Sequence, residues 1–316
     1  MTDGLRLNKN FTLLDTAELC VAGGGLAGVA AALTAADAGV DTVLVEERGA
    51  LGWEVSHGLE IYLSGGKVPA VLATIVEQLA NQKAARGLTL DPVATECLLD
   101  KMLIAKNVRL HFRAFAGGLD ASKGLVRLTT KSGPLAIQAK AIIDATETSR
   151  LAAPQRGTID PRPQVANLQA SDSSQFHRAF LLCAVTPTAI ETSVTVENVG
   201  QAVVRPTLWP HEAHVCVTYS TSQTNPSESN ARFAIARSIE TLRASVAGFE
   251  KASLSLSAHE SFALSPSKIA SATATENVFV AGPRVLGRKP SLEERVELGE
   301  RAAALAIENL KLAAVR

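Results

Sequence analysis

The stretch Cys20–Glu46, CVAGGGLAGVAAALTAADAGVDTVLVE, decides the fold of this 316-residue chain. Its first residues are apolar and lead into three glycines, which indicates a buried strand that ends in a turn. Small, helix-favouring residues follow over 26–38, and Gly39 supplies the left-handed stop of a helix. The apolar, β-branched run 42–46 then predicts a parallel strand that is covered on both faces. The order strand, helix, strand predicts a β-α-β unit and an α/β fold.

The turn in this unit has the pattern G-x-G-x-x-G. Gly23 permits a tight turn, Gly25 lets backbone N–H groups approach a pyrophosphate, and Gly28 lets the helix pack closely on the strand. Glu46 ends the second strand, where a carboxylate can accept hydrogen bonds from the hydroxyls of an adenosine ribose. A glycine turn that merely packs tightly would not explain this acid. We therefore predict a dinucleotide site formed by Gly23, Gly25, Leu26, Ala27, Gly28 and Glu46.

Composition excludes several classes of protein. The chain has 31 Lys+Arg against 31 Asp+Glu and no basic stripe, so we expect no nucleic-acid partner. No apolar run reaches the roughly 20 residues of a membrane span, and the N-terminus lacks a signal-peptide pattern, so we expect a cytoplasmic protein. Cys20, Cys97, Cys183 and Cys216 are far apart, which argues against a disulfide framework or a dithiol centre. Any redox chemistry must then be carried by a cofactor.

Beyond the β-α-β unit, helices are expected over 68–86, with Gly87 ending the helix, and over 91–105, which begins with Asp91-Pro92. Strand-like runs over 108–114, 125–130 and 134–146, with turns at 117–118 and 131–133, predict a small meander that returns into the parallel sheet.

From about residue 151 the sequence becomes rich in Pro, Ser, Thr and Gln, and its runs predict an antiparallel sheet with one helix near 229–247. Residues 276–282 again predict a buried strand, and 291–313 a long amphipathic helix. We therefore expect a Rossmann-like parallel sheet with a β-meander, formed by residues 1–150 and 276–316. Residues 151–275 would be an inserted, mainly antiparallel α+β substrate domain.

Four stretches, at 20–52, 90–112, 131–146 and 276–287, resemble the FAD-dependent oxidoreductases of the glutathione-reductase-like flavoprotein fold. The resemblance is greatest to the group that includes xanthan-lyase-associated flavoproteins. The four stretches cover about half of the chain and follow one another in the same order as in that family. It implies that the dinucleotide is FAD. It also implies cofactor contacts at Glu47, Arg48, Gly52, Trp53, Ala145, Thr146 and Gly282.

Three positions depart from the family's pattern. Glu147 and Trp53 replace glycines that relatives usually have, and the last helix opens with Ser291-Leu292-Glu293-Glu294, a capping-box pattern. In the family, that helix end commonly points toward the flavin, where two carboxylates would compete with an anionic ligand.

The first catalytic candidate is His57, a base with a neutral-range pKa in the segment expected to pass the flavin. The second is Arg284, which could offset charge at the reduced flavin or hold a substrate carboxylate. The alternatives are an ordinary loop histidine and a surface arginine at a strand end. In a strand, His211 and His214 would point to opposite faces, so only His214 and Cys216 share a face and we expect no metal site. His177 and His259 have no motif around them and are expected to be structural.

These observations predict an FAD-dependent oxidoreductase that transfers a hydride between a small organic substrate and flavin N5. No second G-x-G-x-x-G follows a later strand, so oxygen, a quinone or a protein would be the electron acceptor. A first alternative is an accessory or binding subunit with impaired FAD binding that acts through a protein partner. A second is a plain NAD-binding dehydrogenase. Covalent attachment of flavin and an oligomeric state are left open.

Overall fold

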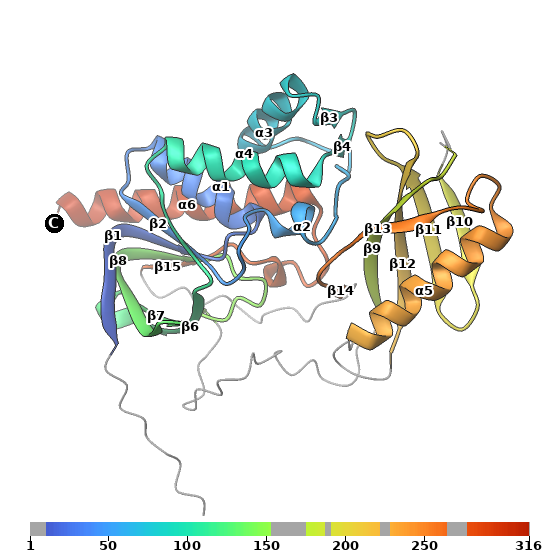
Figure 1. Cartoon of the computed structure of the whole chain (residues 1–316). Helices are drawn as coiled ribbons and strands as arrows, with labels where there is room; N and C mark the ends of the chain where they lie inside the picture. Colours follow the sequence, from blue (N-terminus) through green and yellow to red (C-terminus); the bar gives the residue numbers. More distant parts are fainter. Residues whose placement is uncertain (1–10, 153–174, 187–190, 222–227, 264–276, 316) are drawn as a thin grey trace, which may run out of the picture.

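The computed structural model describes residues 11–152, 175–186, 191–221, 228–263 and 277–315. Its first sheet has the strand order β5-β2-β1-β8-β7-β6, with β15 also paired to β8 (Figure 1). The parallel strands are β1 (Thr12–Ala22), β2 (Thr42–Glu46), β5 (Arg109–Phe112), β8 (Gly133–Asp144) and β15 (Val278–Val280). The strands β6 (Phe115–Asp120) and β7 (Leu125–Thr130) add the antiparallel meander. The expected α/β fold with a Rossmann-like sheet and a meander is confirmed.

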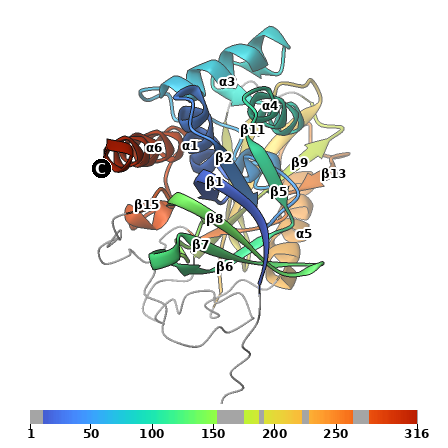
Figure 2. The same cartoon turned by 90° about the vertical axis from the view of Figure 1, so that its left-hand side faces the viewer.

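Long helices cover one face of this sheet (Figures 1 and 2), namely α1 (Leu26–Asp37), α4 (Pro92–Ala105) and α6 (Leu292–Val315). A further helix, α3 (Ala70–Asn81), packs on these helices. Leu19 and Val21 of β1 belong to the core under these helices, whereas Cys20 and Ala22 belong to a separate core with the meander. This alternation along β1 follows from the two-residue period of a strand and explains why the strand is apolar on both faces.

The abundance of small residues in α1 has a packing reason. A Cβ atom on Gly28 would lie 1.7 Å from the Gly23 carbonyl oxygen, and one on Gly299 of α6 would lie 2.0 Å from that of Ala27. Both contacts are far too short for a side chain, so α1 lies against the glycine loop on one side and against α6 on the other. Glycine at these positions is what allows the three segments to meet.

The second sheet has the order β10-β11-β12-β9-β13, with β14 paired to β9. Its antiparallel strands are β9 (Gln175–Cys183), β10 (Thr192–Val196), β11 (Gly200–Pro206), β12 (Glu212–Ser220), β13 (Ser253–Ser257) and β14 (Phe262–Ala263). Helix α5 (Glu228–Ser245) packs on the face that carries Phe180 and Val215. The opposite face carries Ala179 and Leu181, which contact Leu59 of the first part of the chain.

Shorter elements complete the described part of the chain. They are α2 (Trp53–Ser56), β3 (Ala85–Arg86), β4 (Thr89–Leu90) and two 3-10 turns, η1 (Ala121–Lys123) and η2 (Pro283–Val285). Because β15 pairs with β8, the segment after the second sheet returns to the first one. The proposed division into residues 1–150 with 276–316, and an inserted 151–275, stays a prediction.

Three expectations about local structure were wrong. The helix expected over 68–86 ends at Asn81, because residues 85–90 form the β3-β4 hairpin and Gly87 serves its turn rather than a helix stop. The turn expected at 117–118 lies inside β6, where the pairing with β7 shifts by one residue at a bulge. Strand β11 was not expected at all, since Gly200 and Pro206 at its ends obscured a short apolar centre.

Candidate functional site

The loops at the carboxyl ends of the parallel strands converge on one edge of the first sheet. Gly23 N–H donates to the Val45 carbonyl at 2.8 Å, Ala145 N–H to that of Ala22 at 2.8 Å, and Ala281 N–H to that of Asp144 at 2.9 Å. These bonds bring the ends of β1, β2, β8 and β15 together. The residues that follow β1, β2 and β8 line a small hollow of about 10 Å³ there. In open α/β sheets, this edge is where ligands bind.

Eight of the residues expected to bind cofactor line this hollow, namely Gly23, Gly25, Glu46, Glu47, Arg48, Trp53, Ala145 and Thr146. Leu26, Ala27 and Gly28 lie behind it in the buried first turn of α1. Gly52 is the left-handed residue before α2, and Gly282 lies beside Thr146 and Ser149. The structure thus places the predicted residues around one site, and their contacts with a cofactor stay predictions.

Glu46 is buried at the end of β2 and organises the glycine loop. One carboxylate oxygen accepts from Gly24 N–H at 2.6 Å, and the other accepts from Arg48 N–H at 2.7 Å. The side chain is therefore fixed at the mouth of the β1-α1 turn. A carboxylate held here is positioned to accept ribose hydroxyl groups.

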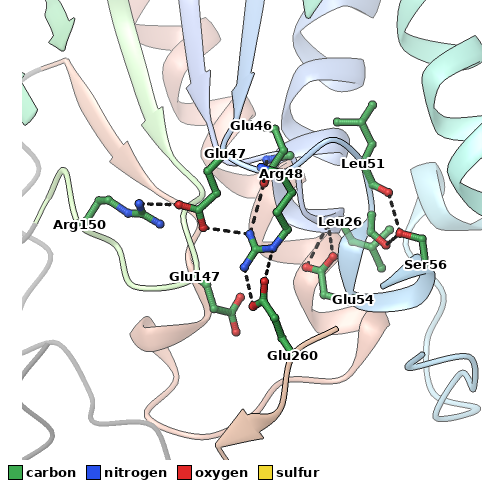
Figure 3. A network of polar contacts seen from close by, with 12 residues as sticks. Leu26, Glu46, Glu47, Arg48, Leu51, Glu54, Ser56, Glu147, Arg150 and Glu260 are labelled. Carbon is green, nitrogen blue, oxygen red and sulfur yellow. Dashed lines mark hydrogen bonds and ion pairs between the residues drawn. The ribbon is translucent and has the colours of Figure 1, made fainter. Parts of the chain in front are cut away.

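Arg48 links this turn to the second part of the chain (Figure 3). Its guanidinium donates two parallel bonds to Glu260, each of 2.7 Å, and a third bond of 3.0 Å to Glu47. Glu47 also accepts from Arg150 at 2.7 Å. The bonds from both arginines keep the pKa of Glu47 below its ordinary value against the opposing effect of burial. The wall of the hollow is thus a network of alternating charges.

A second charged cluster lies at the N-terminus of α1. The Glu54 carboxylate, 1% exposed, accepts from Leu26 N–H at 3.1 and 3.2 Å. Arg295 of α6 contacts Glu54 at 3.2 Å and binds Glu147 through two bonds of 2.7 and 3.0 Å. Glu147 therefore points to a buried cation, and neither Glu54 nor Arg295 was expected at this site.

Trp53 is buried between charged and aromatic groups. The Arg48 guanidinium lies 4.2 Å from the centre of its ring, and the Phe262 ring stacks on it at 5.2 Å with an angle of 14°. The stack joins α2 to the strand β14 of the second sheet.

Asp144, at the end of β8, shapes the loop that follows it. Its completely buried carboxylate accepts from the N–H groups of Thr146, Leu151 and Ala152, at 3.1, 2.8 and 2.8 Å, and from the Thr146 hydroxyl at 2.6 Å. Burial raises its pKa, although these bonds act in the opposite direction. The sequence contained a signal for this role of Asp144, because an acid at the end of an apolar strand must find several hydrogen-bond donors.

The two catalytic candidates lie outside the lining of the hollow. The His57 ring, at the end of α2, lies 4.4 Å from the His259 ring with a tilt of 38°, and its Nε2 lies 3.8 Å from the Glu96 carboxylate. Burial and the neighbouring His259 lower the pKa of His57. Arg284, in η2, donates to the Thr148 carbonyl at 3.2 Å. The structure does not bring these two side chains together.

A further group of titratable side chains lies where β9 faces the first part of the chain. One oxygen of Glu60 is 2.6 Å from His177 Nε2 and 2.6 Å from Lys289 Nζ, and these two nitrogens are 2.7 Å apart. His177 is buried, and the rings of His177 and Phe262 are 5.3 Å apart. The Lys289 and His177 contacts lower the pKa of Glu60 to about 2. His177 lacked any sequence motif because its partners come from distant segments.

His211 and His214, which were expected on one strand, lie in different elements. His211 lies in the turn before β12 with a φ of 63°, and its ring contacts the Val185 carbonyl. His214 lies on β12 and its Nε2 is 2.9 Å from the Leu59 carbonyl oxygen. In the described part of the chain, no three His, Cys, Asp or Glu side chains are grouped as metal ligands would be.

Two observations test whether a dinucleotide fits the hollow. The Leu26 N–H at the helix N-terminus already holds an anion, the Glu54 carboxylate, in the position where a diphosphate binds in such folds. The buried Nε of Arg150 lines the hollow and has no hydrogen-bond partner among the described residues. Arg150 Nε therefore offers an unused donor to an anionic, oxygen-rich ligand. The lining matches the ADP part of a dinucleotide except at the N-terminus of α1, where Glu54 already occupies the Leu26 N–H.

Comparison with known proteins agrees with this geometry. Residues 18–158 match the family model described as FAD dependent oxidoreductase. No curated protein matches the chain.

Solved structures match over nearly the whole chain. A geranylgeranyl bacteriochlorophyll reductase-like protein from Thermoplasma acidophilum is 16% identical with a TM-score of 0.69, over 95% of this chain and 80% of its own. The flavin-dependent brominase Bmp2 is 12% identical, with a TM-score of 0.61 over 93% and 79%. The p-nitrophenol 4-monooxygenase PnpA from Pseudomonas putida is 15% identical, with a TM-score of 0.58 over 95% and 81%. At these identities the likeness concerns the fold. Among the described helices, none is long and apolar enough to cross a membrane.

Proposed function

We propose that this chain binds FAD and transfers a hydride between a small organic substrate and flavin N5, because residues 18–158 match the family model described as FAD dependent oxidoreductase. The observation that carries this proposal is the convergence of the glycine loop, Glu46 and Thr146 on one edge of the parallel sheet. The similar structures are named as a reductase-like protein, a brominase and a monooxygenase, so the family's fold serves several reactions.

In this proposal the chain's residues hold the cofactor from its adenosine end. Glu46 would accept the ribose hydroxyls, the loop Gly23–Gly28 would surround the diphosphate, and Ala145, Thr146 and Gly282 would lie along its path. Glu47, Arg48, Gly52 and Trp53 would follow the cofactor toward its ring system. FAD, when bound, supplies the hydride acceptor or donor.

The protein must also handle the proton that accompanies hydride transfer. His57 is our proposed base, because its lowered pKa keeps the imidazole neutral near pH 7, and Arg284 is proposed to hold a substrate anion. The Glu60, His177 and Lys289 cluster is a second candidate. Its one carboxylate oxygen, Glu60 Oε1, can accept hydrogen bonds from both His177 Nε2 and Lys289 Nζ.

The visible spectrum of the purified protein tests the proposal. We expect flavin absorption bands, and mass spectrometry of the released cofactor should give the mass of FAD. Protein that is colourless, and that takes up no FAD after denaturation and refolding, would refute the assignment. A pyridine nucleotide in the released fraction would instead support the NAD-binding alternative.

Two substitutions test the site itself. Gly25→Val places a side chain against the Glu54 carboxylate, which a Cβ atom alone would approach to 2.5 Å, and Glu46→Ala removes the ribose ligand. Each should lower FAD occupancy, whereas Gly66→Ala, at an exposed glycine, should not. Unchanged occupancy in both variants would mean that the phosphate loop is misassigned. Loss of flavin reduction in His57→Ala with normal occupancy, across a panel of small substrates, would support its role.

A second candidate function is an accessory subunit with impaired FAD binding that acts through a protein partner. The observation that favours it is the pair of carboxylates, Glu54 and Glu147, beside the N-terminus of α1, where each opposes a bound diphosphate. An inability to bind FAD in the folded protein would select this candidate.

We also propose that the protein works in the cytoplasm, with oxygen, a quinone or a protein as its electron acceptor. The support for the compartment is that all four cysteines are free and that Cys97 and Cys183 are exposed thiols, as in a reducing environment. Titration of four thiols in the protein purified without reductant would agree with this, and a disulfide would oppose it.

A further inference from the structure

We propose that Glu54 is an internal competitor of the cofactor: its carboxylate holds the diphosphate position at the N-terminus of α1 and must leave before FAD binds. This inference rests on the proposed function, since it concerns how the same site takes its cofactor. It assigns a role to a residue that no glycine-loop pattern identifies.

The position of the carboxylate carries the argument. Both oxygens of Glu54 lie within 3.2 Å of the Leu26 nitrogen, the first helical N–H of α1. A Cβ atom built on Gly25 would be 2.5 Å from Glu54 Oε1, so the carboxylate lies directly on the glycine that permits a diphosphate to approach. The side chain is 2% exposed, which leaves no room for a second anion beside it.

Electrostatics make this occupation exclusive. The N-terminus of a twelve-residue helix attracts one anion through its free N–H groups and its dipole. A diphosphate brings two negative charges to the same groups, and Glu147 already adds another carboxylate nearby. Two anions at van der Waals distance in a site closed to water repel strongly. The bound cofactor and a charged Glu54 therefore exclude one another from this position.

The surrounding contacts leave Arg295 with a partner when Glu54 withdraws. Arg295 gives Glu54 a single contact of 3.2 Å but holds Glu147 through two shorter bonds, so the guanidinium keeps a partner when Glu54 turns away. Glu54 lies on the one-turn helix α2, which begins after the left-handed residue Gly52.

The competition should depend on pH. The charged groups that act on Glu54 are Arg295 of α6 and Glu147 after β8, and its backbone partner is the Leu26 N–H of α1. Burial, together with Glu147, raises the pKa of Glu54 against the opposing effect of Arg295. Acidification therefore neutralises the competitor, and FAD should bind more tightly as the pH falls from 8.5 toward 5.5.

The experiment is a titration of the apoprotein with FAD, followed by the quenching of flavin fluorescence, at several pH values between 5.5 and 8.5. Glu54→Gln should lower the Kd for FAD about tenfold at pH 8 and flatten its pH dependence, because the amide carries no charge. Glu54→Asp keeps the charge but is one methylene shorter, and it should bind FAD more tightly than the wild type by a smaller factor. Glu77→Gln, on the exposed side of α3, is the matched control and should behave as the wild type.

The outcomes separate this inference from the proposed function. If the wild type binds FAD and Glu54→Gln binds it no better than Glu77→Gln at pH 8, the inference is overturned and the proposed function stands. If Glu54→Gln alone binds FAD, the inference is supported and the accessory-subunit candidate is favoured. If no variant binds FAD, both are overturned. Should Glu54→Gln fail to fold by circular dichroism, Glu54→Asp and the wild-type pH dependence decide, and a pH-independent wild-type Kd counts against the inference.

Discussion

Replacement of Arg295 by methionine should destabilise the protein in a pH-dependent way. The Arg295 side chain is 3% exposed and contacts Glu54, 2% exposed, and Glu147, 32% exposed. After the substitution Glu147 can be hydrated, which limits its share of the cost to less than about 1 kcal/mol. Glu54 has no such escape, because it stays buried without a cation. The loss of a buried partner usually costs about 3 to 5 kcal/mol.

Protonation of Glu54 sets a ceiling on this cost. Neutralising a carboxyl costs about 1.4 kcal/mol for each pH unit above its ordinary pKa, which is 4.5 for glutamate. The ceiling is therefore about 3.4 kcal/mol at pH 7 and about 1.4 kcal/mol at pH 5.5. Since the pKa of Glu54 in the folded variant is raised, the contribution of Glu54 to folding stability is present at low pH and is lost as the pH rises. The defect should accordingly shrink on acidification.

The assay is urea unfolding followed by circular dichroism, without added FAD, at pH 5.5 and pH 7. Arg237→Met is the control, because Arg237 forms a solvent-exposed pair with Glu240 on α5 and should cost less than about 0.5 kcal/mol. An Arg295→Met variant within 1 kcal/mol of the control at pH 7, or one whose defect grows toward pH 5.5, would refute this reasoning about the buried cluster.

Three further predictions concern the scaffold of the site. Gly28→Ala should prevent normal folding, since its Cβ atom would meet the Gly23 carbonyl oxygen at 1.7 Å, whereas Gly39→Ala, with φ of 77° and open space, should cost only about 1 to 2 kcal/mol in thermal unfolding. Asp144→Ala should lower the free energy of unfolding in urea by roughly 3 kcal/mol or more, because three N–H groups and a hydroxyl lose their acceptor. A change below about 1 kcal/mol would show that the loop 145–152 keeps its conformation without these bonds. Burial lowers the pKa of His214 to about 4 in the folded protein, from 6.5 in the unfolded chain. Between these two pH values the unfolded chain binds a proton that the folded protein does not, so this group should lower the free energy of unfolding of the wild type by roughly 3 kcal/mol as the pH falls from 6.5 to 4. A His214→Asn variant with the same pH dependence as the wild type would contradict this assignment.

Much of the first sheet and of the glycine loop could be predicted from the sequence, because local backbone requirements set them. The N-cap at Asp91, whose carboxylate accepts from Ala94 N–H at 2.8 Å, and the reciprocal bonds between Ser291 and Glu294 are confirmed. Each depends on residues three positions apart. The end of α3 was misjudged because the hairpin over 85–90, rather than helix propensity, determines the conformation there.

The sequence by itself determined the β-α-β unit, the glycine turn and the acid at the end of β2, since strand, helix and turn preferences act over a few residues. Only the tertiary structure decided which charges share a site. Glu54 and Arg295 are 241 positions apart, and His177 meets Glu60 across 117 positions. Such pairs form when the order of strands in a sheet brings distant segments together, and burial then makes each unpaired charge too costly to keep. No local pattern records that requirement, so the carboxylate at the start of α1 became visible only in the folded chain.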